Sequence, residues 1–311
     1  MKKYLVLAVV MAIVSFCLSQ DSPAPGRDKL AIGEHTADLA GIHFWYRVAG
    51  HGPLLVVQAP GWGAGSQYLQ NGLALLEKDF TVVYYDPRGS ARSSRPSDPK
   101  LMATDDMIDD LDRLRGYWGL KSITVLGHSQ GGAIALGHAI SHPEVVHKLI
   151  LVDACTEDHD FRAERAREIA ARKDDPRFKD AIAAMTGNND PQTDEEFAAF
   201  LKKIMPLYFY DPASGMPLFA KTDTALPSIW ARHAIGTTGR PVTKQESLLD
   251  HVKAQTLVMV GHDDWICPVA EGQRLNKGIQ DSRLVVLDKS GHFPWIEAPS
   301  QFFAEVVQFA K

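Results

Sequence analysis

The stretch Ser122-Ile123-Thr124-Val125-Leu126-Gly127-His128-Ser129-Gln130-Gly131-Gly132 decides the fold. Its first half is a short, β-branched apolar run that is typical of a buried strand. Its second half opens a helical pattern that ends near His142-Pro143. Between the two lies Gly-x-Ser-x-Gly, a turn in which small residues leave room for a strand to reverse into a helix. We therefore predict that Ser129 stands exposed above a sheet as a candidate nucleophile.

The runs around this turn alternate between strand and helix patterns. Segments 35–39 and 42–49 read as an antiparallel hairpin, and six later runs are apolar on both faces, which suits a parallel sheet covered by helices on each side. The six runs are 54–57, 81–85, 123–126, 149–152, 257–260 and 284–287, and the helical segments are 67–77, 104–118, 131–141, 269–278 and 299–310. We predict an α/β fold with a mostly parallel, doubly wound sheet, in which ligands bind at the carboxyl ends of the strands.

The alternation breaks between Asp153 and Gln255, where the sequence is helical and charged. A loop of that length is rarely structureless inside a compact domain. We therefore expect a helical cap over residues 155–254, inserted into a core made of residues 29–154 and 255–311, with a linker over 20–28. The cap is expected to shape a substrate pocket.

The first residues have the layout of a secretory signal. Lys2 and Lys3 precede an apolar run from Tyr4 to Leu18, and a polar segment follows. The run is shorter than the ~20 residues that a membrane-spanning helix needs. We expect residues 1–19 to be removed and the protein to be secreted or periplasmic, with a retained membrane anchor or a lipid on Cys17 as alternatives.

Composition narrows the class of protein. The chain has 311 residues, 45% hydrophobic and 23% charged, with a formal net charge of −5, so there is no basic excess of the kind that binds nucleic acid. Removal of the leader would leave Cys155 and Cys267 in an oxidising compartment. A disulfide between them is geometrically possible, although two free buried thiols are the prediction we adopt. The oligomeric state stays open.

A serine hydroxyl needs a base to take its proton, and the base needs an acid to orient it. On this kind of sheet the expected chain order is serine, acid, histidine. Asp264 follows the run 257–260 and His292 follows the run 284–287, so both should lie at the same sheet edge as Ser129. The alternatives are His262 and His128 for the base, and Asp263 and Asp153 for the acid.

Attack on a carbonyl builds negative charge on its oxygen, which requires hydrogen-bond donors at that position. One donor should be the backbone N–H of Gln130 at the start of the helix. The second should come from the loop after the first parallel strand, where Pro60 has no N–H. We select Trp62, with Gly61 as the alternative, and we expect Gly61, His128 and Trp265 to contact the substrate.

Together these segments resemble the α/β-hydrolase superfamily from Gly41 to Ala310. The motifs that carry the resemblance are Pro60-Gly61-Trp62-Gly63, Asp86-Pro87-Arg88-Gly89-Ser90, Gly127-His128-Ser129-Gln130-Gly131, Gly261-His262-Asp263-Asp264 and Ser290-Gly291-His292-Phe293-Pro294-Trp295. The resemblance implies a serine hydrolase in which Ser129 attacks, His292 moves the proton and Asp264 orients His292.

Segments 85–93 and 206–212 look similar to proline iminopeptidase-like members, which implies release of an amino-terminal residue whose ammonium is held by cap carboxylates. The candidates for that role are Glu157, Asp194, Glu195, Glu196 and Asp211. Two departures oppose this interpretation. That group typically has His-Gly-Gly-Pro-Gly in the oxyanion loop and a tryptophan after the nucleophile, whereas this chain has Ala59-Pro60-Gly61-Trp62-Gly63 and Gln130.

The leading hypothesis is hydrolysis of a small-molecule ester or amide through an acyl-serine intermediate, without a metal or an organic cofactor. A proline iminopeptidase-like aminopeptidase acting on short peptides is the nearer alternative. Cofactor-free lyase or perhydrolase chemistry on the same triad is a more distant one. A ligand-binding protein that keeps the fold without turnover is the alternative from another class.

Overall fold

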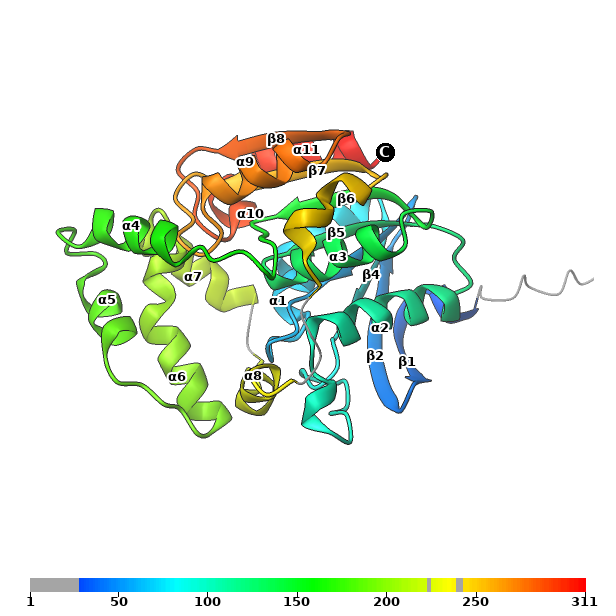
Figure 1. Cartoon of the computed structure of the whole chain (residues 1–311), viewed down its shortest axis with the longest axis horizontal. Helices are drawn as coiled ribbons and strands as arrows, with labels where there is room; N and C mark the ends of the chain where they lie inside the picture. Colours follow the sequence, from blue (N-terminus) through cyan, green and yellow to red (C-terminus); the bar gives the residue numbers. More distant parts are fainter. Residues whose placement is uncertain (1–27, 223–224, 239–242) are drawn as a thin grey trace, which may run out of the picture.

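The computed structural model describes residues 28–222, 225–238 and 243–311. The predicted leader over residues 1–19 and most of the predicted linker lie outside these ranges. Within them, the chain alternates strands and helices around one large sheet (Figure 1). The predicted α/β class is confirmed.

Eight strands form the sheet in the order β1-β2-β4-β3-β5-β6-β7-β8. The first two form the antiparallel hairpin expected from the sequence, and β2 also pairs antiparallel with β4, whereas all other neighbours are parallel. The strands are β1 Gly33–Leu39, β2 Ile42–Gly50, β3 Leu54–Gln58, β4 Thr81–Tyr85, β5 Ile123–His128, β6 Val146–Val152, β7 Gln255–Gly261 and β8 Ser282–Leu287.

Helices cover both faces of the sheet because successive strand residues point to opposite sides. Val56 faces a buried cluster that includes side chains of α2, α3 and α9, whereas Leu55 and Val57 face a cluster that includes side chains of α1 and α11. These core helices are α1 Gln67–Gly72, α2 Thr104–Tyr117, α3 Gln130–Ser141, α9 Val269–Gly278, α10 Pro294–Glu297 and α11 Pro299–Ala310. Burial on both faces explains why the parallel strands read as continuous apolar runs.

The segment between β6 and β7 is helical in its described part, as the sequence predicts, and no strand occurs there among the residues that are placed. It contains α4 Arg162–Arg172, α5 Lys179–Thr186, α6 Asp194–Ile204, α7 Pro212–Thr222 and α8 Ile229–Ile235. Figure 1 shows these helices grouped on one side of the sheet, where they form the cap. No helix in the described ranges is both long enough and apolar enough to cross a membrane.

One helix differs from its predicted length. The run 67–77 was expected to be one helix, but α1 ends at Gly72 and a 3-10 helix, Ala74–Lys78, continues the chain. Leu73 between them has φ −101° and ψ 9°, outside the α-helical region. Leu69, Leu73 and Leu76 are all fully buried, so the apolar spacing that predicts one long helix is satisfied by two short pieces.

Candidate active site

Ser129 occupies the turn between β5 and α3. Its backbone has φ 58° and ψ −128°, a left-handed conformation that is strained for a residue with a Cβ atom. The turn is held on both sides, because the Ser129 N–H donates to the Val152 carbonyl at 3.0 Å and the Ser129 carbonyl accepts from the Gly132 N–H at 2.9 Å. The surrounding sheet and helix therefore impose a geometry that raises this hydroxyl above the strand ends.

The glycines of the motif are required by close backbone approach. A Cβ atom at Gly127 would lie 2.4 Å from the Gly131 carbonyl oxygen, and one at Gly131 would lie 2.3 Å from the Gln58 carbonyl oxygen. Both distances are far below van der Waals contact, so only hydrogen atoms fit there. These contacts explain the spacing from which the turn was predicted.

His292 and Asp264 come together at the same sheet edge. The His292 ring lies with Nδ1 at 2.8 Å from Asp264 Oδ2, and both side chains are almost fully buried. A carboxylate can only accept, so Nδ1 carries a proton, and in the neutral form of the ring the lone pair then lies on Nε2. His292 and Ser129 line the same cavity. The structure thus brings the predicted nucleophile, base and acid to one edge of the sheet.

The backbone fixes the two loops that carry this pair. The His292 N–H donates to the Tyr208 carbonyl of the cap at 2.7 Å, and the Ile266 N–H donates to Asp264 Oδ1 at 2.8 Å. From α4, Arg165 Nε donates to the Ile266 carbonyl at 2.7 Å, and Arg172 donates to the Asp263 carbonyl. The cap therefore helps to position His292 and the loop of Asp264, a role that the strand and helix patterns did not reveal.

His128, one of the alternative bases, is fully engaged elsewhere. Its Nε2 lies 2.9 Å from the His292 carbonyl, which can only accept, so Nε2 donates and Nδ1 accepts from the Tyr68 hydroxyl at 2.7 Å. Burial lowers the pKa of His128 well below its ordinary value, so the ring is neutral. It borders the apolar cavity, as a substrate contact requires, but both ring nitrogens are already used.

Among the described residues, no hydrogen bond joins the His292 ring to His262, the remaining candidate base, or to the candidate acids Asp263 and Asp153, although an Asp153 oxygen lies within 4.8 Å of a His292 ring nitrogen. His262 Nδ1 lies 3.4 Å from Asp263 Oδ2, and the His262 side chain is 63% exposed. Asp153 is fully buried at the end of β6, where its Oδ1 accepts from the Gly261 N–H at 2.8 Å. Burial, followed by the neighbouring Asp264 charge, raises the pKa of Asp153 well above its ordinary value. Asp264 is the acid that contacts the ring.

The two residues expected to donate to an oxyanion, Gln130 and Trp62, lie next to Ser129 in the chain and at the same cavity, respectively. Gln130 is the first residue of α3, so its backbone N–H has no intrahelical acceptor. The Gly61 N–H, by contrast, donates to Gln130 Oε1 at 3.1 Å. This hydrogen bond occupies the alternative donor and leaves the Trp62 N–H as the choice that fits better. Trp62 also borders the cavity that contains Ser129, whereas Gly61 does not.

The Gln130 side chain starts a short polar chain that the sequence did not suggest. Gln130 Nε2 lies 3.4 Å from Thr104 Oγ1, which donates to Glu157 Oε1 at 2.9 Å. The chain of contacts thus runs from the oxyanion loop through the first turns of α3 and α2 to the start of the cap. It couples the position of Gly61 to the core.

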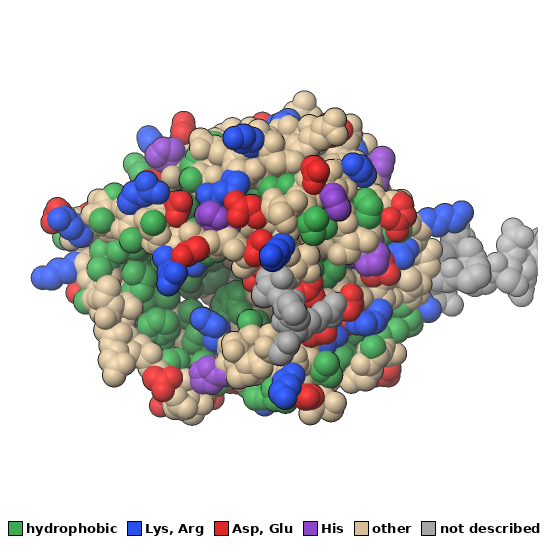
Figure 2. Space-filling model, in the orientation of Figure 1, with side chains coloured by type: hydrophobic (Ala, Val, Ile, Leu, Met, Phe, Trp, Pro, Cys, Tyr) green, Lys and Arg blue, Asp and Glu red, His purple; other side chains and the backbone are tan. Residues whose placement is uncertain are grey.

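An apolar cavity of about 420 Å³ opens beside Ser129 and His292. Its walls come from the oxyanion loop, α1 and the cap, with Trp62, Leu201, Met216 and Phe219 among them. The space-filling view shows a hollow surrounded by hydrophobic side chains on the cap side of the molecule (Figure 2). A pocket of this size and character suits a small organic group rather than a charged one.

A second, more polar cavity of about 440 Å³ also reaches Ser129. Glu157, Arg165 and Arg232 line it, together with Cys155 and Cys267. Burial is the main cause that raises the pKa of Glu157, against the hydrogen bond from Thr104, which lowers it. Of the five carboxylates proposed to hold an ammonium group, Glu157 is the one that borders a cavity at the serine.

The other four carboxylates serve the helices of the cap or face solvent. Asp194 Oδ1 accepts from the Ile229 N–H at 2.7 Å, Glu196 Oε2 accepts from the Gln192 N–H at 2.8 Å, and Asp211 accepts from Ala213 and Ser214. Glu195 is exposed in the first turn of α6. Acidic residues at helix starts are stabilised by the helix dipole, which accounts for their presence without a ligand.

Trp265, which was expected to contact the substrate, lies away from both cavities at Ser129. It packs instead with Phe178, Ala181 and Leu207, at a ring-centroid distance of 6.0 Å from Tyr208. Because Asp264 turns inward to His292, the next side chain in the loop points toward the cap. Trp265 therefore joins the cap to the acid loop.

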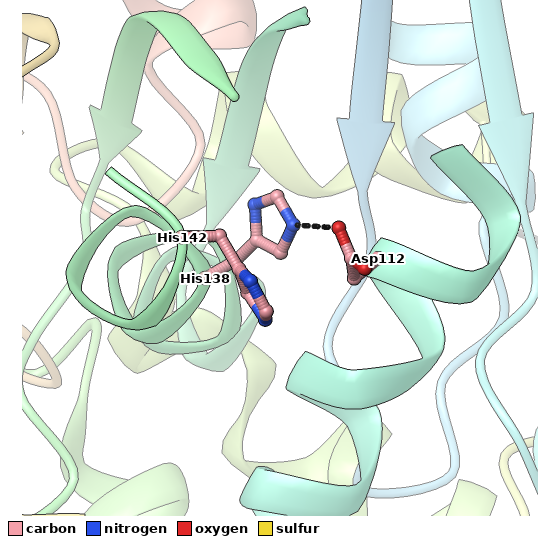
Figure 3. Close-up of side chains that lie close together, drawn as sticks. All are labelled: Asp112, His138 and His142. Carbon is pink, nitrogen blue, oxygen red and sulfur yellow. Dashed lines mark hydrogen bonds and ion pairs between the residues drawn. The ribbon is translucent and has the colours of Figure 1, made fainter. Parts of the chain in front are cut away.

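A separate cluster of ionisable side chains lies at the far end of α3. His138 Nε2 lies 3.4 Å from Asp112 Oδ1, and His142 is close by, with ligand-type atoms of all three within 4.8 Å of one another (Figure 3). Arg115 Nε donates to the same Asp112 oxygen at 2.8 Å. This ion pair and hydrogen bond account for the orientation of the carboxylate, and we assign the cluster a structural role.

The chain matches known hydrolases over most of its length. A sequence model described as the alpha/beta hydrolase fold matches residues 54–299. The chain is 27% identical over 267 residues to the putative carbamate hydrolase RutD of Pseudomonas savastanoi pv. phaseolicola, covering 83% of this chain and 93% of that protein. It is 25% identical over 272 residues to the proline iminopeptidase PfmaB of Pestalotiopsis fici, covering 84% and 93%.

Solved structures share the fold. The proline iminopeptidase-related protein of Thermus thermophilus superposes with a TM-score of 0.67 at 25% identity, covering 88% of this chain and 95% of that one. An esterase from Exiguobacterium antarcticum gives the same TM-score at 22% identity, covering 89% and 99%.

Proposed function

The chain belongs to the alpha/beta hydrolase fold family, and on that premise we propose that it hydrolyses a carboxylic ester or amide through an acyl-serine intermediate. The observation that carries the proposal is that Ser129, on its strained turn, and His292 line one cavity, while the Asp264 carboxylate lies 2.8 Å from His292 Nδ1. The two relatives named above are a putative carbamate hydrolase and a proline iminopeptidase, both hydrolytic enzymes by name.

In the proposed reaction His292 Nε2 takes the Ser129 proton as Oγ attacks the carbonyl carbon. The backbone N–H groups of Gln130 and Trp62 hold the negative oxygen of the tetrahedral intermediate. His292 then gives the proton to the leaving alcohol or amine, which leaves an acyl group on Ser129. Water attacks this acyl-enzyme with His292 as base, and Asp264 stabilises the charged ring in both steps.

The apolar cavity supports a substrate with a hydrophobic group next to the scissile carbonyl. A bulky apolar acyl or alcohol part would be held beside Ser129 by burial of its surface, without charge pairing. The expected substrates are therefore small-molecule esters or amides with one hydrophobic side.

Labelling with a fluorophosphonate probe tests the nucleophile. The wild-type protein should be labelled at neutral pH, and Ser129→Ala should not, while keeping the thermal unfolding midpoint of the wild type. Resistance of the folded wild type to the probe would contradict the enzyme proposal and favour a ligand-binding protein. Labelling of Ser129→Ala would show that another residue is the nucleophile.

An aminopeptidase is the second candidate, and Glu157 is the observation in its favour, because this cap carboxylate reaches the cavity at Ser129. Two nearby arginines, Arg165 and Arg232, make the same cavity less suitable for an ammonium group. Comparison of p-nitrophenyl acyl esters with amino-acid p-nitroanilides separates the two. The aminopeptidase would become the leading candidate if the wild type cleaved proline p-nitroanilide rapidly and showed no esterase activity, and if Glu157→Gln lost that cleavage.

A further inference from the structure

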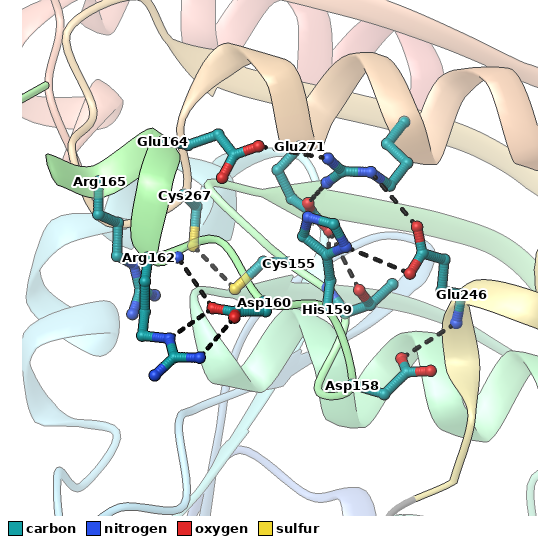
Figure 4. A network of polar contacts seen from close by, with 12 residues as sticks. Cys155, Asp158, His159, Asp160, Arg162, Glu164, Arg165, Glu246, Cys267 and Glu271 are labelled. Atoms are coloured by element: carbon teal, nitrogen blue, oxygen red, sulfur yellow. Dashed lines mark hydrogen bonds and ion pairs between the residues drawn. The ribbon is translucent and has the colours of Figure 1, made fainter. Parts of the chain in front are cut away.

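Two thiols lie side by side at the junction of the core and the cap. Cys155 Sγ is 3.3 Å from Cys267 Sγ (Figure 4). Cys155 stands three residues after β6 ends, where the chain leaves the sheet, and Cys267 stands three residues after Asp264. A disulfide bond is about 2.05 Å long, so the two sulfur atoms are already within about 1.3 Å of bonding distance.

The two thiols differ in access to solvent. Cys155 is partly exposed, and both residues border the polar cavity that contains Ser129. Cys267 is only 1% exposed, and burial raises the pKa of its thiol, with the neighbouring Cys155 adding to the effect. A reagent in the cavity therefore reaches Cys155 first, and Cys267 lies behind it in position to react second.

We propose that Cys155 and Cys267 are a modification site, a dithiol that small-molecule disulfides such as oxidised glutathione convert to an intramolecular disulfide. The inference rests on the position of the two sulfur atoms and does not depend on the proposed hydrolase activity.

The disulfide forms by two successive thiol–disulfide exchange reactions. The Cys155 thiolate attacks one sulfur of oxidised glutathione, forms a mixed disulfide and releases one glutathione thiolate. The Cys267 sulfur then attacks Cys155 Sγ as its proton leaves to solvent, which forms the protein disulfide and releases the second glutathione. The two protein thiols lose two electrons, and the glutathione disulfide gains them.

The bond would close a loop that contains the whole cap. The two cysteines are 112 residues apart, and the segment between them contains α4 to α8, β7 and Asp264. Cross-linking a long loop restricts the unfolded chain. We therefore expect the unfolding midpoint of the oxidised protein to exceed that of the reduced protein by about 5 to 15 °C.

The experiment uses the full chain with Cys17→Ser, which leaves Cys155 and Cys267 as its two thiols. After incubation with oxidised glutathione, we expect both thiols to be lost to titration in denaturant. A non-reducing digest should contain one peptide pair joined through Cys155 and Cys267, and dithiothreitol should reverse the rise in unfolding midpoint.

Cys155→Ser in the same background is the matched control, because Cys155 is the less buried of the two. Its unfolding midpoint should not rise after oxidation, and its digest should contain no joined peptides. Two thiols that still titrate after the treatment, a glutathione adduct on each cysteine, or a dimer joined between chains would each overturn the proposal.

Discussion

The buried carboxyl group of Asp153 adjoins that of Asp264, the acid that contacts His292. Asp153 Oδ1 accepts from the Gly261 N–H, and its Oδ2 is buried without a hydrogen-bond partner in the part of the chain that the structure describes. Burial and the Asp264 charge raise the pKa of Asp153 well above its ordinary value. A protonated Asp153 resolves both observations, because its hydroxyl can then donate toward Asp264.

Because Asp153 and Asp264 have different protonation states in this interpretation, their replacement by asparagine should affect activity differently. Asp264→Asn should lower kcat/KM by about 10³ to 10⁴-fold, because an amide cannot stabilise the charged His292 ring or hold its tautomer. Asp153→Asn should stay within about tenfold of the wild type, because it replaces a group that is already neutral. Steady-state kinetics on one p-nitrophenyl ester measures both. An equal loss in both variants would identify Asp153 as a second essential acid.

The side chain of Gln130 should act on the rate through the oxyanion loop. Gln130→Ala removes the acceptor of the Gly61 N–H and loosens the segment that contains Trp62. We expect kcat to fall about tenfold with little change in KM, since the loop acts on the transition state. Thr104→Val removes the other contact of the Gln130 amide but keeps the Gly61 hydrogen bond, so it should keep most of the rate. An equal loss of rate in Thr104→Val would indicate that the contact with Thr104 matters more.

The sequence predicted the sheet, and the proximity of the three candidate residues, because both depend on local patterns. The apolar runs predicted the parallel strands, and a loop after each strand end positioned Ser129, Asp264 and His292 at one edge. The position of Trp265, which the sequence did not predict correctly, depends on contacts with the cap. Whether Trp265 turns toward the serine or toward Phe178 is decided by packing between the acid loop and the cap, and periodicity within one segment contains no information about it.

The same limit applies to the polar contacts. Gln130, Thr104 and Glu157 come from three separate segments, and each is individually a common surface residue type. Their proximity follows from the packing of α2 against α3 and from the path by which the chain leaves β6. The carboxylates Asp194 and Glu196, conversely, have a local explanation, because both lie in the first turn of α6.

His138 should make stability depend on pH. Burial lowers its pKa to about 4 in the folded protein, against about 6.5 in the unfolded chain. The ring is neutral when folded, so the stabilisation is complete above pH 6.5 and is lost as the pH falls toward 4. The loss between pH 7 and pH 4 is about 3 kcal/mol.

His138→Gln tests this contribution, since glutamine does not titrate. The free energy of unfolding of each protein is measured by urea denaturation at pH 7 and at pH 4. Between these two pH values the wild type should lose about 3 kcal/mol more than His138→Gln. His251→Gln changes an exposed histidine and should follow the wild-type curve. Parallel curves for the wild type and His138→Gln would contradict the lowered pKa.

The apolar cavity should determine the preference for acyl length. Met216 borders it from α7, and Met216→Trp would fill part of its volume. We expect kcat/KM for p-nitrophenyl octanoate to fall at least about tenfold relative to the acetate, because the longer chain loses its space while the short one still fits. Leu218→Trp, two residues further along α7 and 45% exposed, adds the same ring outside the cavity and should leave the octanoate to acetate ratio unchanged. A ratio that is unchanged in Met216→Trp as well would place the acyl chain in the polar cavity instead.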